Sequence, residues 1–230
     1  MTDPASGEAR FMHAFAHDLR SYLRTMQTRV QLIQRAAAAS LPEQENRWLN
    51  EAIAAGEDMG RLIGAMVTYC GAAPVRETMS LALLLRGLRI DLAAMLTEAE
   101  AELSIAESAS DIAVSRSLST VLRELVGNSC KFRRPGVPPE IRIASKMTDT
   151  ENVEVAVADN GSGVASEYME AIFEPFRRMH SRSDYPGFGL GLALCRRITA
   201  SNGGTIEAAS GPNGGLSVRV VLPAVRAEKA

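Results

Sequence analysis

The chain has 230 residues, of which 46% are hydrophobic, and its formal net charge is −2 at neutral pH. This length fits two modest domains better than one large domain, and the apolar content predicts a folded chain. The near-zero net charge gives no electrostatic reason to expect nucleic acid or an anionic membrane as a partner.

The cysteines and the hydropathy pattern indicate a compartment. Cys70, Cys130 and Cys195 are scattered, and their odd number and spacing argue against a disulfide framework and against a zinc site. No run of about 18 apolar residues is present, and the N-terminus lacks the basic-then-apolar pattern of a signal peptide. We therefore expect a cytoplasmic protein with no membrane span.

The first third of the chain predicts a helical hairpin. Apolar residues alternate at intervals of four and three along a first helix over about residues 8–39, which is a heptad pattern. Proline disfavours helix at the residue before it, so Pro42 should interrupt this pattern. A second heptad pattern follows over residues 48–66. The two seams are Leu19, Leu23, Met26, Val30, Ile33 and Ala37, and then Trp48, Ala52, Ala55, Met59, Leu62 and Met66.

One hairpin cannot cover both of these seams. Phe11, Phe15 and Tyr22 add further apolar surface to the first helix. Two copies paired into a four-helix bundle would cover all of it, so we expect a homodimer.

His17 is a candidate nucleophile on the first helix. It precedes the seam residue Leu19 by two positions, about 200° around the helix, so it should face solvent. A solvated surface histidine is the simpler interpretation of that position alone. The carboxylate of Asp18 favours a chemical role, because it could accept the imidazole proton or hold its tautomer while the other nitrogen attacks phosphorus.

The rest of the chain predicts an α/β sandwich. Residues 71–78 resemble a linker, and Ser80 is expected to cap a helix that ends at about Leu96. Further helices are expected at 115–132, 164–172 and 190–201, and strands at 101–106, 141–147, 153–158, 205–209 and 216–222. Three helices would pack against one face of a mixed sheet.

A polar face of the 115–132 helix is a candidate phosphate and metal site. Asn128 is one helical turn from Glu124 and close to one turn from Lys131, so these side chains share a face. Mg²⁺ prefers oxygen ligands and retains waters and phosphate oxygens, so the amide oxygen of Asn128 would suffice. Lys131 would donate to phosphate oxygens, and Glu124 would position a metal-bound water or polarise the site. The alternative is a polar helix face in solvent.

Asp159 follows an apolar strand and is a candidate base-recognition residue. Its carboxylate could accept a hydrogen bond from the exocyclic amine of adenine, and Gly161 and Gly163 would leave room for the flat base. The alternative is a simple hairpin turn. The segment after it predicts a helix and not a paired strand, which favours a nucleotide site.

Three glycines, Gly187, Gly189 and Gly191, lead directly into the 190–201 helix. The amides and the positive dipole end of a helix N-terminus suit an anion, and glycines let the backbone approach phosphates closely. The segment is neither a P-loop, since no GK[ST] follows, nor a Rossmann motif, since no strand directly precedes it.

The segment before these glycines is expected to form a lid over residues 177–186. Phe173 and Phe176 are expected to pack at its base as structural support. Its arginines could stabilise phosphate charge, although solvation at the surface explains them equally well. They are Arg177, Arg178 and Arg182.

Taken together, these motifs resemble those of a protein family. Residues 124–132 (ELVGNSCKF), 159–163 (DNGSG), 173–176 (FEPF) and 187–192 (GFGLGL) are similar to the N, G1, F and G2 boxes of a histidine-kinase ATP-binding domain. Residues 15–20 (FAHDLR) resemble the phosphoacceptor H box. Residues 131–139 and 179–187 look like the kinase modules attached to bacterial phytochromes, although no chromophore site is implied.

The resemblance implies an α+β fold of two parts. A dimerisation and phosphotransfer hairpin would occupy residues 1–73, and an ATP-binding domain of the Bergerat type would occupy residues 74–225. His17 would take the γ-phosphoryl group of ATP, with Mg²⁺ as cofactor and with Asp18 and Glu124 as further catalytic residues. An aspartate of a response-regulator receiver domain would then accept the phosphoryl group. Because only 16 residues precede His17, we expect the input to come from a separate sensory protein, or the chain to be a fragment.

Two residues depart from the family pattern. Tyr22 stands where relatives have a proline that kinks the helix, so the helix should be straighter and the switching mode that uses the kink is in doubt. Ser21 stands where relatives with phosphatase activity often carry threonine or asparagine, which leaves phosphatase activity open. The competing functions are a phosphotransferase or phosphatase with a weakened ATP site, a serine kinase of the same nucleotide fold, and a nucleotide-sensing scaffold.

Overall fold

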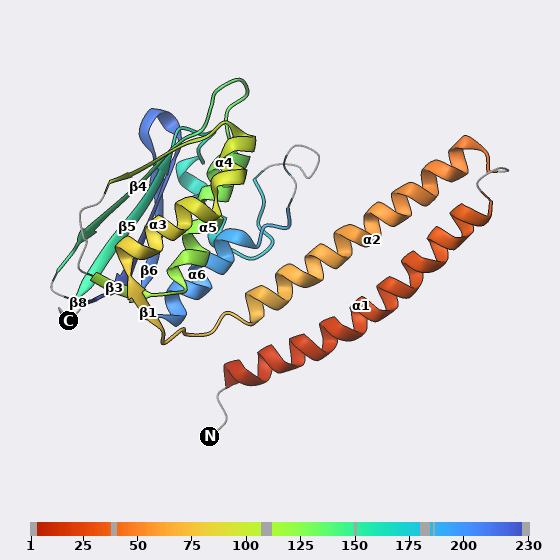
Figure 1. Cartoon of the computed structure of the whole chain (residues 1–230), viewed down its shortest axis with the longest axis horizontal. Helices are drawn as coiled ribbons and strands as arrows, with labels where there is room; N and C mark the ends of the chain where they lie inside the picture. Colours follow the sequence, from red (N-terminus) through yellow and green to blue (C-terminus); the bar gives the residue numbers. More distant parts are fainter. Residues whose placement is uncertain are drawn as a thin grey trace. The chain divides into compact units, whose positions relative to one another are not determined.

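The structure is a computed structural model that describes residues 4–37, 41–106, 112–149, 151–179, 185 and 187–226. The chain divides after Gly71 into two compact units, which are treated separately below. Figure 1 shows the helices and strands of both units. Among the described residues, no helix is both long enough and apolar enough to cross a membrane.

The first unit is a pair of helices, as the heptad patterns predict. Helix α1 spans Pro4–Ala36 and helix α2 spans Glu43–Cys70. Pro42 occupies the N-cap position of α2, and residues 38 and 39 of the expected first helix lie outside the described residues. Helix α1 continues without a break through Tyr22. The absence of a proline there is consistent with this continuity.

The two helices contact each other through small and aliphatic side chains. Ala16, Leu23 and Ile63 are buried together, and Leu19 and Val67 pack against them. On α2, glycines recur every four residues on this side, and a Cβ at Gly56 would lie 2.9 Å from the side chain of Gln27. These glycines, Gly56, Gly60 and Gly64, permit a close approach of α1.

The face of α2 that contacts α1 is therefore not the predicted seam. Trp48 and Met59 of that seam are 55% and 53% exposed. The heptad count follows large apolar residues, whereas this contact depends on glycines, which the count leaves out. The seam lies about 90° around α2 from the contact face, by the helical periodicity of 100° per residue.

The second unit is a sandwich of helices on a sheet. Five strands form a mixed sheet in the order β2-β4-β5-β7-β6, with β2 and β4 parallel and all other neighbours antiparallel. The strands are β2 (Glu102–Ala106), β4 (Glu140–Met147), β5 (Asn152–Asp159), β6 (Thr205–Ser210) and β7 (Leu216–Pro223). The helices α3 (Leu81–Asp91), α4 (Ala93–Ala99), α5 (Leu118–Lys131) and α6 (Gly191–Ser201) cover one face (Figure 1).

The core lies between this sheet face and the helices. Strands β4 and β5 alternate buried and less buried residues, as expected for a sheet with one covered face. Helix α5 lies in the middle of the helical layer and buries one apolar stripe, which leaves its opposite face for polar residues. The buried stripe comprises Leu118, Val121, Leu122, Leu125 and Val126.

The second unit differs from the sequence-based expectations in three places. A separate sheet of short strands was not expected, and it consists of β1 (Thr78–Ser80), β3 (Ile112–Ser115) and β8 (Val225–Arg226). The helix expected after Ser80 breaks at Leu92 into α3 and α4, and the Ser80 side chain makes no capping hydrogen bond.

The third correction concerns residues 164–172. They form no α-helix but two short 3₁₀ turns, η1 (Ser166–Tyr168) and η2 (Ala171–Phe173). Hydrogen bonds between residues three apart close these turns, and the second turn buries Ile172 and Phe173. A third turn, η3 (Pro212–Gly214), precedes β7.

Candidate functional site

Glu124, Asn128 and Lys131 lie on one polar face of α5. Glu124 and Lys131 are partly buried, and each influences the titration of the other. Burial raises the pKa of Glu124, and the positive charges of Arg123 and Lys131 oppose that rise. Burial also lowers the pKa of Lys131, and the nearby Arg178 guanidinium lowers it further against the effect of Glu124. Lys131 and Arg178 are therefore close enough to repel each other, which favours binding of an anion beside them.

The glycine segment before α6 lies against this polar face of α5. A Cβ at Gly187 would stand 2.9 Å from Lys131 Nζ, and a Cβ at Gly191 would stand 2.7 Å from Glu124 Oε2. Gly187 also has a φ of 133°, which L-residues with a side chain rarely adopt. The fold thus brings the N-terminus of α6 beside the polar face of α5.

Asn128 lies between these two contacts. The amide nitrogen of Asn128 would be 3.8 Å from a Cβ at Gly191, and the described part of the chain gives its amide oxygen no hydrogen-bond partner. The donor set fits a nucleotide with Mg²⁺, because an oxygen ligand, a lysine and a helix N-terminus meet here. Among the described residues, no group of three or more His, Cys, Asp or Glu side chains could hold a metal ion by itself.

Asp159 ends β5 and is held by three donors. Its Oδ1 accepts hydrogen bonds from the backbone N–H groups of Gly161 at 2.9 Å and of Leu216 at 3.0 Å. Its Oδ2 accepts a hydrogen bond from Ser129 Oγ at 2.9 Å. The carboxylate is thus fixed in orientation.

Gly161 and Gly163 each lie close to a backbone carbonyl of another segment. A Cβ at Gly161 would lie 2.7 Å from the Phe132 carbonyl oxygen, and one at Gly163 would lie 2.2 Å from the Gly214 carbonyl oxygen. Backbone carbonyls of the protein itself therefore require glycine at both positions, whether or not a base binds there. Room for a flat base beside these glycines stays a prediction.

This packing makes Gly163 sensitive to substitution. Gly163→Ala is expected to lower the free energy of unfolding by about 1–3 kcal/mol, because the methyl group meets a carbonyl oxygen and φ is positive at 67°. Chemical denaturation measures the difference. Gly136→Ala is the matched control, because Gly136 also has a positive φ, at 72°, but no atom within 4 Å of a Cβ. Equal destabilisation by both substitutions would contradict the packing argument.

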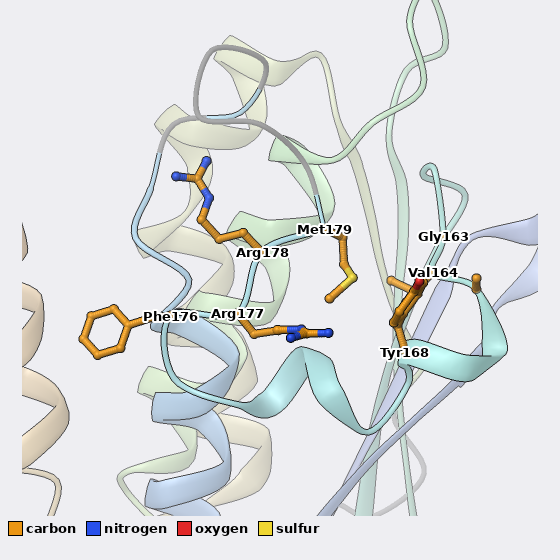
Figure 2. Close-up of a pocket in the computed structure, with 8 residues that line it drawn as sticks. Gly163, Val164, Tyr168, Phe176, Arg177, Arg178 and Met179 are labelled. Carbon is orange, nitrogen blue, oxygen red and sulfur yellow. The ribbon is translucent and has the colours of Figure 1, made fainter.

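A cavity of about 580 Å³ opens beside the loop that follows β5 and contains Gly163, called the Gly163 loop below. Its lining combines apolar side chains with two guanidinium groups, and Figure 2 shows the Arg177 side chain extending toward Tyr168. Of the predicted site residues, Gly163 lines the cavity and the α5 cluster does not. The lining residues are Gly163, Val164, Ala165, Tyr168, Phe176, Arg177, Arg178 and Met179.

The phenylalanines of the 173–176 segment differ from each other. Phe173 is buried, and the Arg196 guanidinium stacks 4.6 Å from its ring centroid, in line with a structural role. Phe176 is 53% exposed, has a φ of 63° and points away from the other labelled residues in Figure 2. The expectation that Phe176 packs under the lid is therefore wrong. Its backbone N–H instead donates to the Gly189 carbonyl at 2.9 Å, which ties the two segments together.

Much of the expected lid cannot be described. Residues 180–184, with Arg182, and residue 186 lie outside the described residues. Arg177 is exposed, whereas Arg178 is partly buried and donates to the Tyr185 carbonyl oxygen at 2.9 Å. The ring of Tyr185 packs against that of Phe132, with centroids 4.9 Å apart.

In the first unit, His17 faces solvent, as its helical position predicts. Its side chain is 84% exposed, and its Nδ1 lies 3.2 Å from Asp18 Oδ1. A carboxylate in this position favours a proton on Nδ1, which leaves the lone pair of Nε2 free to act as a nucleophile.

Sequence reasoning missed two residues of the second unit. Ser129 is buried and donates to Asp159, and Arg134 Nε donates to the Gly161 carbonyl oxygen at 3.0 Å. Arg134 also donates to the carbonyl of Asn213, so it joins the loop that contains Gly161 to η3. Neither contact has a local signal, because the partners are far apart in the sequence.

Comparisons with known proteins agree with this geometry. Residues 113–226 match the family described as histidine kinase-, DNA gyrase B-, and HSP90-like ATPase. The chain is 28% identical over 223 residues to the phytochrome-like protein Cph1 of Synechocystis, which covers 93% of this chain and 29% of Cph1. It is 27% identical over 236 residues to the signal transduction histidine-protein kinase/phosphatase MprB of a Mycobacterium species, which covers 97% of this chain and 45% of MprB.

The fold has a counterpart among solved structures. Full-length ShkA in complex with AMPPNP superimposes with a TM-score of 0.70 and 21% identity, over 96% of this chain and 47% of ShkA. The chain spans less than half the length of both curated relatives.

Residues 113–226, within the second unit, are therefore similar to the histidine kinase-, DNA gyrase B-, and HSP90-like ATPase family. Over nearly its whole length, hairpin included, the chain is similar to Cph1 and to the histidine-protein kinase/phosphatase MprB.

Proposed function

We propose that this protein is a histidine kinase that uses ATP to phosphorylate His17. The observation that carries the proposal is the contact of Gly187 and Gly191 with Lys131 and Glu124, which joins a helix N-terminus to a cationic and acidic helix face. This combination suits the phosphates of a nucleotide. The domain family and the relatives support the same conclusion.

The candidate site residues of the second unit have the following roles in this proposal. Asp159 accepts a hydrogen bond from the amine of the base, and Lys131 and Arg178 bind phosphate oxygens. Asn128 would supply an oxygen ligand for Mg²⁺, and Glu124 would orient a water of that ion or polarise the site. Bound Mg²⁺ supplies neutralisation of the phosphate charge. Gly187, Gly189 and Gly191 let the backbone amides reach the phosphates.

The transfer itself takes place at the imidazole of His17. Nε2 forms a bond to the γ-phosphorus, the bond from that phosphorus to the β–γ bridging oxygen breaks, and ADP leaves with the electron pair. Asp18 holds the proton on Nδ1 and stabilises the positive charge that develops on the ring. The N–P bond is labile, so the phosphoryl group can pass on to an aspartate of a response-regulator receiver domain.

The wider setting belongs to the same proposal. We place the protein in the cytoplasm, with the hairpin over residues 1–73 and the ATP-binding domain over residues 74–225. Because Tyr22 and Ser21 depart from the family pattern, phosphatase activity is not part of this proposal.

The hairpin is proposed to form a homodimer. An apolar stripe on α1 stays exposed, and it consists of Phe11, Phe15, Tyr22, Met26 and Ile33, which are 67%, 48%, 72%, 65% and 55% exposed. Helical periodicity in an antiparallel pair places this stripe and the α2 seam on the same side of the hairpin. Burying both against a second copy leaves His17 in solvent, because it is about 200° from Phe15.

Substitutions on and off the stripe test the dimer. Met26→Glu is expected to convert a dimer into a monomer, because it places a charge in an apolar interface. Leu32→Glu is the matched control, since Leu32 is 50% exposed but lies on another side of α1. Sedimentation velocity gives the oligomeric state. A wild-type monomer at micromolar concentration, or a Met26→Glu dimer, would contradict the proposal.

Incubation with γ-labelled ATP and Mg²⁺ tests the function. Label that is lost in acid and survives base is expected, as for a phosphohistidine. Acid-stable label would instead indicate a serine or threonine kinase. ATP binding without label would favour a phosphotransferase, a phosphatase or a nucleotide-sensing scaffold.

A further inference from the structure

Ser129 occupies a buried position behind the polar face of α5. It follows Asn128 directly and is 4% exposed. Its Oγ lies 2.9 Å from Asp159 Oδ2 and 3.2 Å from the Leu125 carbonyl oxygen. A hydroxyl has one proton, so these acceptors compete for it, and the shorter contact to a charged carboxylate is the stronger one. Ser129 therefore donates to Asp159.

Among the described residues, the donors to Asp159 leave one lone-pair position on Oδ2 unused. A carboxylate has about four lone-pair positions, two on each oxygen. The backbone N–H groups of Gly161 and Leu216 use both positions on Oδ1. Ser129 uses one position on Oδ2. A ligand that donates a hydrogen bond to Asp159 therefore meets Oδ2, the oxygen that Ser129 holds in place.

We propose that Ser129 is a positioning residue that aims Asp159 Oδ2 at the 6-amino group of a purine. The inference rests on the proposed function, because it takes a nucleotide as the ligand. The orientation that Ser129 imposes offers an acceptor and no donor to the base edge. A 6-amino purine pairs with this acceptor, whereas the 6-oxo group of a guanine nucleotide would face it with another acceptor. Without Ser129, Oδ2 loses the one hydrogen-bond donor that the described residues give it, and with it its fixed direction.

Two nucleotides separate this role from general packing. The dissociation constants of ATP and of purine riboside triphosphate, which lacks the 6-amino group, are measured for the wild type, Ser129→Ala and Ser129→Thr. Ser129→Ala is expected to weaken ATP binding about tenfold, the order of one hydrogen bond to a charged group, and to change binding of the analogue less than twofold. Ser129→Thr keeps the hydroxyl and is expected to retain the preference for ATP.

Ser145→Ala is the matched control, because Ser145 is another buried serine of the same unit, at 5% exposure, on β4. It is expected to leave the ratio of the two dissociation constants unchanged. An equal loss of affinity for both nucleotides in Ser129→Ala would overturn the inference, because a packing defect does not distinguish the bases. A wild type without preference for ATP over the analogue would overturn it as well.

The test also separates this inference from the proposed function. A protein that prefers ATP through Ser129 but never labels His17 would retain the positioning role and lose the kinase. A protein that labels His17, while Ser129→Ala keeps the full preference for ATP, would retain the kinase and lose the positioning role.

Discussion

His17→Gln is expected to abolish the acid-labile label from γ-labelled ATP while ATP binding stays within twofold of the wild type. Glutamine has no ring nitrogen that can attack phosphorus, and His17 lies on the helical hairpin, a separate unit from the ATP-binding domain. The substituted side chain is 84% exposed, so the fold should not change. Gel electrophoresis without acid treatment, followed by autoradiography, measures the label. A nucleotide-binding titration measures ATP binding.

His13→Gln is the matched control for this experiment. His13 lies one helical turn before His17 on α1 and is also exposed, but no acidic residue follows it. It is expected to keep the label of the wild type. Label that survives in His17→Gln, or that disappears in His13→Gln, would contradict the assignment of the phosphoacceptor.

Glu124→Gln is expected to lower the rate of phosphorylation by about 10- to 100-fold, the range found when a group that orients a metal-bound ligand is removed. The Glu124 carboxylate contacts the start of α6 and lies on the same face as Asn128. The amide of glutamine keeps the shape but removes the charge. Single-turnover rates at saturating ATP measure the loss, with Glu167→Gln, an exposed carboxylate on η1, as control.

The pH dependence gives this prediction a second test. Burial raises the pKa of Glu124 above its ordinary value of 4.5, so the carboxylate takes up a proton at a higher pH than an exposed glutamate does. If the charged form is required, the wild-type rate falls as the pH drops through this raised pKa, and the fall is complete below it. This acid limb should be absent in Glu124→Gln. An identical pH profile in both proteins would remove Glu124 from the chemistry.

The sequence predicts the long elements of this fold because their patterns are long. Heptad spacing over several turns identifies α1 and α2, and alternation over eight residues identifies β4 and β5. The strands β1, β3 and β8 have four residues or fewer, too short for any periodicity to emerge. The α1–α2 contact was missed for another reason: it depends on Gly56 and Gly60, whose lack of a side chain carries no hydropathy signal.

In the candidate site, too, local spacing is predictable from the sequence and contacts between distant residues are not. Helical spacing alone places Glu124, Asn128 and Lys131 on one face, because residues three and four apart share a face on any helix. The hydrogen bond from Ser129 to Asp159 joins residues 30 positions apart, so only the packing of α5 on β5 creates it. The Gly163 loop shows the same limit, since the Gly214 carbonyl that requires its glycine comes from a distant turn.

The measurement that tests the account most directly is tandem mass spectrometry of the protein after incubation with ATP and Mg²⁺, with digestion at alkaline pH to preserve a phosphoramidate. We expect phosphate on His17 of the wild type and, at an early time point, about 10- to 100-fold less phosphate on His17 of Glu124→Gln. Phosphate on His13, or on a serine or threonine, would contradict it, as would an unmodified chain that binds ATP.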